Sequence, residues 1–193
     1  MQHNDFTLGS KDLETGGVGF LTPAAATTQE ADRQALAQSF ARQLQAMRPE
    51  VRVVTLSEIL SAVNAVDLDQ QYKEMYRDYL ETSILEGSTL KQVGETGGVR
   101  YLAQLSLASF TQSNRGRFSL LGVRIFDTKL GNLRVFIQIW DSQTAAVAWE
   151  GGAELNYAYD TGAEKPVTFL EVTRLAAERL FSELPGATPE PAS

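Results

Sequence analysis

The sequence predicts an α/β (α+β) domain: a mixed sheet with a parallel βαβ start and a four-stranded antiparallel meander, with helices packed on one face. Between Val99 and Leu155 most of the strongly apolar aliphatic residues stand at odd positions, and Leu102 and Leu120 are among the few exceptions. Because side chains alternate across a strand, this parity predicts one dry sheet face and a strongly specified register. Ahead of the meander, a β-branched run at 51–56 follows an amphipathic segment, which predicts a right-handed parallel crossover.

The first elements follow from local patterns. An apolar run at 18–22 predicts a short buried strand that ends at Pro23. The spacing of Thr27 and Glu30 matches a capping box, so a helix is expected to start there and to stop before Pro49.

Three helices are expected between the crossover and the meander. They span about 57–65, a longer segment that Asp69 caps and that reaches Ile84, and about 88–95. The longer helix carries three tyrosines at helical spacing, which favours core packing with each hydroxyl at the water-facing rim; they are Tyr72, Tyr76 and Tyr79.

The meander is expected to be followed by one more amphipathic helix. Turn-forming residues at 114–116, 131–132 and 141–144 divide the meander into strands at about 99–111, 117–127, 133–141 and 146–157. The last helix, at about 166–184, is expected to cover the odd face of the sheet.

Length and composition predict one globular domain over residues 17–184. The chain has 193 residues, of which 43% are apolar and 21% charged, and this composition is typical of a folded domain. The polar, glycine-containing segment 1–16 reads as a flexible tether, and the proline-rich segment 185–193 as a flexible tail. Oligomeric state is left open.

Charge and cysteine content exclude several classes of function. The formal net charge is −7, and the basic residues are scattered along the chain, which argues against a nucleic-acid partner. There is no cysteine, so disulfides, thiolate metal sites and cysteine nucleophiles are excluded. No apolar stretch reaches the roughly 18 residues that a membrane-spanning helix needs.

No enzyme, cofactor or metal is predicted. The single histidine, His3, lies in the predicted tether, so histidine-based catalysis lacks its central residue. Glu150 and Glu154 share the even face but stand roughly 13 Å apart along a strand, too far for a glycosidase pair. Asp127 and Asp141 read as turn formers in preference to cation ligands. Carboxylates that folding brings together from distant segments remain the open alternative.

The even face of the meander nevertheless carries aromatic side chains where water is expected. With the register set by the predicted turns, Phe110 is expected opposite Phe118, Leu120 beside Trp140, and Arg124 beside Phe136, which in turn neighbours Glu150. These residues would form a cross-strand apolar patch with a charged rim, which is typical of a protein interface. The predicted partner-binding residues are Phe110, Phe118, Leu120, Arg124, Phe136, Trp140 and Glu150. The alternative is that a helix, or the amino-terminal segment with Phe6 and Leu8, covers this patch.

The order of elements resembles a group of envelope lipoproteins. The resemblance lies in the segment Gly17–Pro23, the strand 51–55, the segment 97–102 that leads into the meander, and the strand, aspartate turn and strand over 135–150. The group comprises the curli-secretion lipoprotein (CsgG-like) family, the penicillin-binding-protein activator lipoproteins and the amino-terminal domain of TolB. The chain departs from it by lacking a lipobox and the long amphipathic hairpins of the curli pore.

The resemblance implies a noncatalytic periplasmic accessory or adaptor domain, anchored to the outer membrane through a lipid outside this sequence, that binds or regulates a cell-envelope protein. The partner's identity is left open, as is the presence of a signal peptide and lipidated cysteine before residue 1. The alternative function is a small-molecule or glycan-binding module that uses a crevice between the tyrosine-bearing helix and the sheet.

Overall fold

The computed structural model describes residues 2–25, 30–120, 123–161 and 168–186. These residues form a seven-stranded mixed sheet with the order β1-β7-β6-β5-β2-β4, and β3 also pairs with β5. The strands are β1 (Gln2–Asp5), β2 (Val18–Phe20), β3 (Ala24–Ala25), β4 (Val53–Val54), β5 (Tyr101–Leu120), β6 (Val123–Asp141) and β7 (Ala146–Thr161). The helices are α1 (Asp12–Gly16), α2 (Glu30–Met47), α3 (Leu56–Ala65), α4 (Asp69–Thr82), α5 (Gly87–Gly97) and α6 (Phe169–Phe181). The predicted mixed α/β class is confirmed.

The parallel start of the sheet is confirmed as well. β2 pairs in parallel with β4 on one side and with β5 on the other. Helix α2 connects β3 to β4 and ends two residues before Pro49. Thr27 of the predicted capping box lies outside the described residues.

Helices α3 and α4 begin in different ways. Thr55 caps α3 through a capping box, in which the Glu58 carboxylate accepts a 2.7 Å hydrogen bond from the Thr55 backbone N–H. The prediction that Asp69 caps α4 is wrong, because Leu68 occupies the cap position without a side-chain hydrogen bond. Asp69 is the first helical residue, where its charge complements the helix dipole.

Helix α5 is capped by a carboxylate with a low pKa. The Glu86 side chain accepts hydrogen bonds from the backbone N–H groups of Ser88 at 2.7 Å and Thr89 at 2.8 Å. These bonds, with the Thr89 bond the strongest influence, lower the pKa of Glu86 to about 2.

Replacing this cap is expected to cost stability. Glu86→Ala should lower the free energy of unfolding by about 1 kcal/mol at pH 7, a typical value for a lost cap. Because the pKa of Glu86 in the folded state lies below its ordinary value of 4.5, this stabilisation is complete above pH 4.5 and is lost as the pH falls towards about 2. Urea unfolding of both proteins between pH 7 and pH 3 checks this. Glu74→Ala, at an exposed position on α4, is the control, and a pH-independent difference for Glu86→Ala would contradict the assignment.

The sequence predicted a four-stranded meander, but the structure has three longer strands in this region. Residues 114–116 and 131–132, predicted as turns, lie inside strands, since Asn114 pairs with Lys129 and Gln112 with Gly131. The β5–β6 connection falls at 121–122, outside the described residues. Glycine and asparagine permit turns but do not require them, and here the neighbouring strand already provides a partner position for each of these residues. The predicted turn after Asp141 is confirmed.

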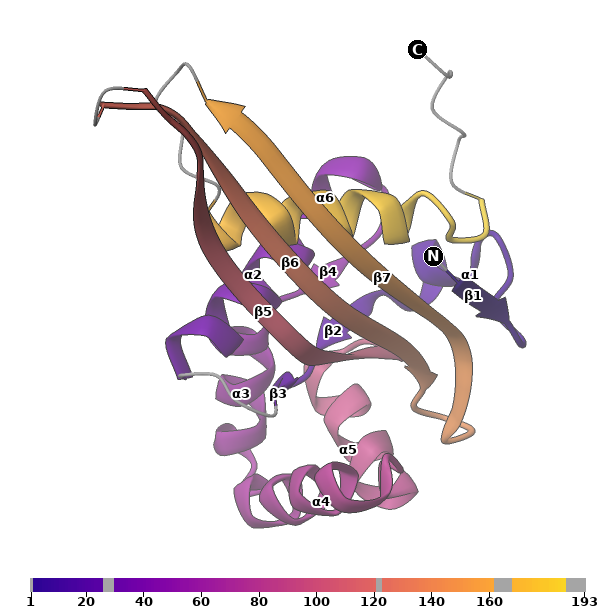
Figure 1. The fold of residues 1–193 in the computed structure, drawn as a ribbon. Helices are drawn as coiled ribbons and strands as arrows, with labels where there is room; N and C mark the ends of the chain where they lie inside the picture. Colours follow the sequence, from indigo (N-terminus) through magenta and orange to yellow (C-terminus); the bar gives the residue numbers. More distant parts are fainter. Residues whose placement is uncertain (1, 26–29, 121–122, 162–167, 187–193) are drawn as a thin grey trace.

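Helices cover both faces of the sheet, whereas the sequence predicted one (Figure 1). Helices α2 and α6 pack on the odd face, as predicted for the last helix, in a core that includes Phe40, Trp149 and Phe181. Helices α3, α4 and α5 form a second core on one end of the even face, which buries Leu102 and Trp140. Figure 1 shows the far ends of β5, β6 and β7 projecting beyond both helical layers.

The amino-terminal segment is part of the fold and not a free tether. β1 pairs antiparallel with β7 and so extends the sheet at that edge. Leu8 and Leu13 are buried in the core of the odd face. Residues 187–193 of the predicted tail lie outside the described residues. In the part of the chain that the structure describes, no helix has the length and apolar character needed to cross a bilayer.

Candidate interaction groove

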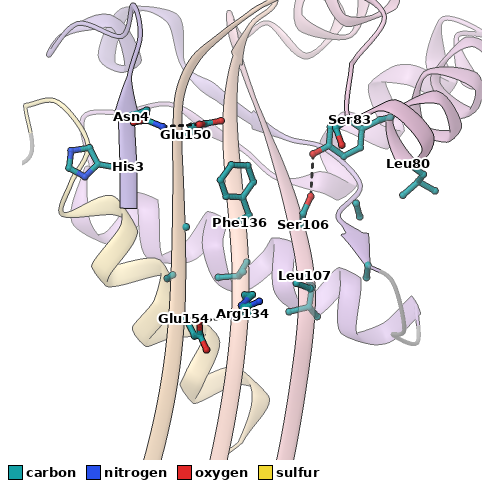
Figure 2. Close-up of a pocket in the computed structure, with 17 residues that line it drawn as sticks. His3, Asn4, Leu80, Ser83, Ser106, Leu107, Arg134, Phe136, Glu150 and Glu154 are labelled. Carbon is teal, nitrogen blue, oxygen red and sulfur yellow. Dashed lines mark hydrogen bonds and ion pairs between the residues drawn. The ribbon is translucent and has the colours of Figure 1, made fainter. Parts of the chain in front are cut away.

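A groove of about 740 Å³ lies on the part of the even face that the second helical layer leaves open. Strands β5, β6 and β7 form its floor, the end of α4 and strand β3 form one wall, and β1 forms the other. Figure 2 shows Phe136 in the middle of the floor, with Leu80 and Ser83 on one side and His3 and Asn4 on the other.

Phe136 is exposed because its neighbours across the strands are small. It pairs with Ser106 on β5 and with Gly152 on β7. The ring leans towards Gly152, where a Cβ atom would lie 3.4 Å from the Cδ2 atom of Phe136. Phe136 remains 36% exposed. The sheet therefore presents an aromatic ring to the groove.

Three charged side chains surround this ring; two of them form an ion pair with each other, and the third contacts neutral groups. Arg134 donates to Glu154 at 2.9 Å, so these two charges compensate each other. The Glu150 carboxylate accepts from the Asn4 side-chain amide at 3.0 Å and from that of Gln138 at 3.4 Å. Both partners of Glu150 are neutral, so its negative charge has no opposite charge beside it among the described residues.

The tyrosines of α4 hold the helical wall against the sheet. The Tyr79 hydroxyl lies 3.2 Å from Ser106 Oγ and donates to Gln138 Oε1 at 3.3 Å. The Tyr72 hydroxyl accepts from the backbone N–H of Thr22 at 2.9 Å. Burial raises the pKa of both hydroxyls. These are structural contacts between α4, the strands and the segment after β2, so core packing of this stripe is confirmed for these two residues.

Of the predicted patch, the structure brings Phe136 and Glu150 into the groove. Trp140 is 6% exposed and belongs to the core under α3, α4 and α5, so its prediction as a partner-binding residue is wrong. The side chains of the other four, Phe110, Phe118, Leu120 and Arg124, lie outside the described set.

The cross-strand neighbours predicted for those residues are wrong. Phe110 pairs with Leu133 and not with Phe118, and Leu120 pairs with Val123 and not with Trp140. Arg124 pairs with Ser119 and not with Phe136. Phe136 pairs with Gly152, and Glu150 lies two residues before Gly152 on β7. The cause is the displaced turn, together with a bulge between Leu107 and Ser109 that shifts the parity of β5 by one.

Sequence reasoning missed the groove residues from other segments. Asn4 and Leu80 lie on its walls, and the exposed Leu80 beside the tyrosine stripe was the one available signal. The alternative that a helix covers the patch is confirmed for Trp140, whereas the two amino-terminal residues named for that role lie elsewhere: Leu8 is buried on the opposite face and Phe6 is exposed.

Asp141 has a structural role at the turn after β6. Its carboxylate receives the Arg100 guanidinium at 2.7 Å and the backbone N–H of Gln143 at 3.0 Å. Over the described ranges, no cluster of three or more histidine, cysteine or acidic side chains could hold a metal ion.

A seven-stranded mixed sheet between two helical layers, with an open groove on one face, defines a small α/β domain. Two crystal structures of the PelC dodecamer from Paraburkholderia phytofirmans have this fold. Both are 11% identical in sequence to this chain, and each comparison covers 95% of it. One structure gives a TM-score of 0.54 and is covered over 97% of its own length, and the other gives 0.51 and is covered over 94%. The lipoprotein GNA1162 from Neisseria meningitidis gives 0.44 at 10% identity, over 85% of this chain and 96% of its own. No family model and no curated protein sequence matches the chain.

Proposed function

We propose that this protein is a noncatalytic accessory domain of the bacterial cell envelope that binds a partner protein in the groove around Phe136. One observation carries the proposal: an aromatic ring, 36% exposed, lies on the floor of a preformed groove and is framed by charged and amide side chains. An apolar centre with a polar rim is the arrangement found in protein interfaces.

The envelope location rests on resemblance. The order of elements along the sequence resembles that of periplasmic lipoproteins. Membership of the CsgG-like group and anchoring to the outer membrane remain predictions. The absence of catalytic chemistry is likewise part of the proposal.

Affinity capture from a bacterial envelope extract tests the binding site. Phe136→Ser is expected to weaken capture of the specific partner by about 30-fold, because an exposed aromatic anchor is worth about 2 kcal/mol when truncated. The measurement is the amount of partner retained at a series of bait concentrations.

The matched control is Leu170→Ser, which removes an exposed apolar side chain from α6 on the opposite face of the sheet. It should leave capture unchanged. Equal capture by the wild type, Phe136→Ser and Leu170→Ser would remove the groove as the binding site. Trp140 is unsuitable for this test because its substitution would open the core.

A second candidate function, a small-molecule or glycan-binding module, has one observation in its favour. The groove lies between α4 and the sheet, where the sequence placed the alternative crevice, and its volume of about 740 Å³ is within the range of ligand pockets. A thermal-shift screen with small molecules and soluble glycans tests it. A ligand at 100 times its dissociation constant adds roughly 2.7 kcal/mol of apparent stability, and this gain should disappear in Phe136→Ser.

A further inference from the structure

We infer that the groove selects a cationic side chain, foremost an arginine, on the segment of the partner protein that enters it. This inference rests on the proposed function and deepens it, because it names the chemistry that the groove recognises. Two adjacent groups carry it, the Glu150 carboxylate and the ring of Phe136.

Glu150 is oriented for an incoming positive charge. Asn4 on β1 and Gln138 on β6 hold its two oxygens from two different strands. Both contacts are neutral amides, so they fix the position of the carboxylate without compensating its charge. A carboxylate oxygen can accept more than one hydrogen bond, so acceptor capacity remains for an arginine or lysine N–H.

Phe136 supplies the second half of the site. A guanidinium over the face of a phenylalanine ring is attracted by the π electrons when it lies within about 6 Å of the ring centre. The small neighbours Ser106 and Gly152 leave the groove side of this ring uncovered. A planar guanidinium can stack flat on the ring while its edge donates to a carboxylate, whereas a lysine ammonium has no planar face to stack.

The other charges of the groove agree with this preference. Arg134 is engaged by Glu154 at 2.9 Å, and His3 lies 3.5 Å from Glu183. Glu150 is therefore the uncompensated charge among the described groove residues. The chain's net charge of −7 also favours the approach of a basic partner.

The test is an NMR titration of the full chain with N-acetyl-arginine amide, and with N-acetyl-citrulline amide as the neutral analogue of the same shape. The arginine compound is expected to shift the backbone N–H signals of Gly151 and Gly152 in a saturable way at millimolar concentration. The citrulline compound should bind about tenfold more weakly. Equal shifts with both compounds, or none with either, would overturn the inference.

Two isosteric variants locate the charge that matters. Glu150→Gln should weaken the arginine compound about tenfold, whereas Glu154→Gln should change its affinity less than twofold, because Arg134 already compensates Glu154. Glu150→Gln is also used as bait in the envelope capture. If Phe136→Ser loses the partner and Glu150→Gln retains it fully, the cationic preference is wrong and the groove stands as the binding site. If neither variant affects capture, the proposed function fails as well.

Discussion

Trp149→Ala is expected to destabilise the protein by about 3–5 kcal/mol, the largest effect of any single substitution considered for this chain. Trp149 on β7 is fully buried in the core beneath α6. The Trp149 ring packs directly over the backbone of Gly151, where a Cβ atom would lie 2.5 Å from the Cη2 atom of Trp149. Only glycine leaves room for the ring at that position. Truncation removes the buried ring and leaves a cavity that the closely packed sheet and helix cannot fill.

Trp149→Phe is the informative companion to that variant. The indole Nε1 of Trp149 has no hydrogen-bond partner among the residues that the structure describes, so phenylalanine removes an unpaired polar group along with part of the ring. Trp149→Phe should therefore lower the free energy of unfolding by less than about 2 kcal/mol. Denaturant unfolding with a common m-value measures both variants. A loss below 1 kcal/mol for Trp149→Ala would show that this core tolerates the cavity, contrary to the packing described.

Asp141→Asn is expected to cost about 2 kcal/mol, because it removes the charge from a buried carboxylate that organises the β6–β7 turn. The Asp141 side chain is 8% exposed and that of Arg100 is 42% exposed, so the arginine regains solvation when the pair is broken. The guanidinium donates to both carboxylate oxygens, and the backbone N–H of Gln143 donates to one of them. Asparagine keeps the shape but presents an N–H₂ group to the guanidinium.

The cost of Asp141→Asn should depend on pH. Burial raises the pKa of Asp141, but the hydrogen bonds from Arg100 and Gln143 outweigh it, so the pKa lies below its ordinary value of 3.8. The wild type therefore holds the full contribution above pH 3.8 and loses it as the pH falls through the lower value in the folded state. Unfolding experiments at pH 7 and at pH 3 should show the two proteins converging in acid.

The exposed pair Arg134–Glu154 provides the comparison for this prediction. Both of its side chains are about half exposed, so Glu154→Gln should change stability by less than about 0.5 kcal/mol at either pH. Equal effects of Glu154→Gln and Asp141→Asn at pH 7 would contradict the role given to burial.

Local patterns in the sequence were sufficient for most of the secondary structure. The helical stripe with Leu36, Phe40 and Leu44 predicts α2, and the odd-numbered apolar residues predict which face of β6 is buried. These patterns succeed because each depends on neighbours within one or two turns of a helix, or on the two-residue period of a strand. The same local logic placed turns at 114–116 and 131–132, where pairing with the neighbouring strand keeps the chain extended.

The sequence predicted part of the candidate site, and the packing of distant segments decided the rest. From the amino-acid order alone one obtains an α/β domain with one dry sheet face, and an aromatic residue at 136 and a carboxylate at 150 that share the opposite face. Whether that opposite face is open was decided by the packing of α3, α4 and α5, which bury Trp140 and leave Phe136 at the surface. The fold also brought Asn4 to Glu150 across 146 positions of sequence. Contacts over such separations arise when distant segments bury their apolar surfaces together, and no pattern of neighbouring residues encodes them.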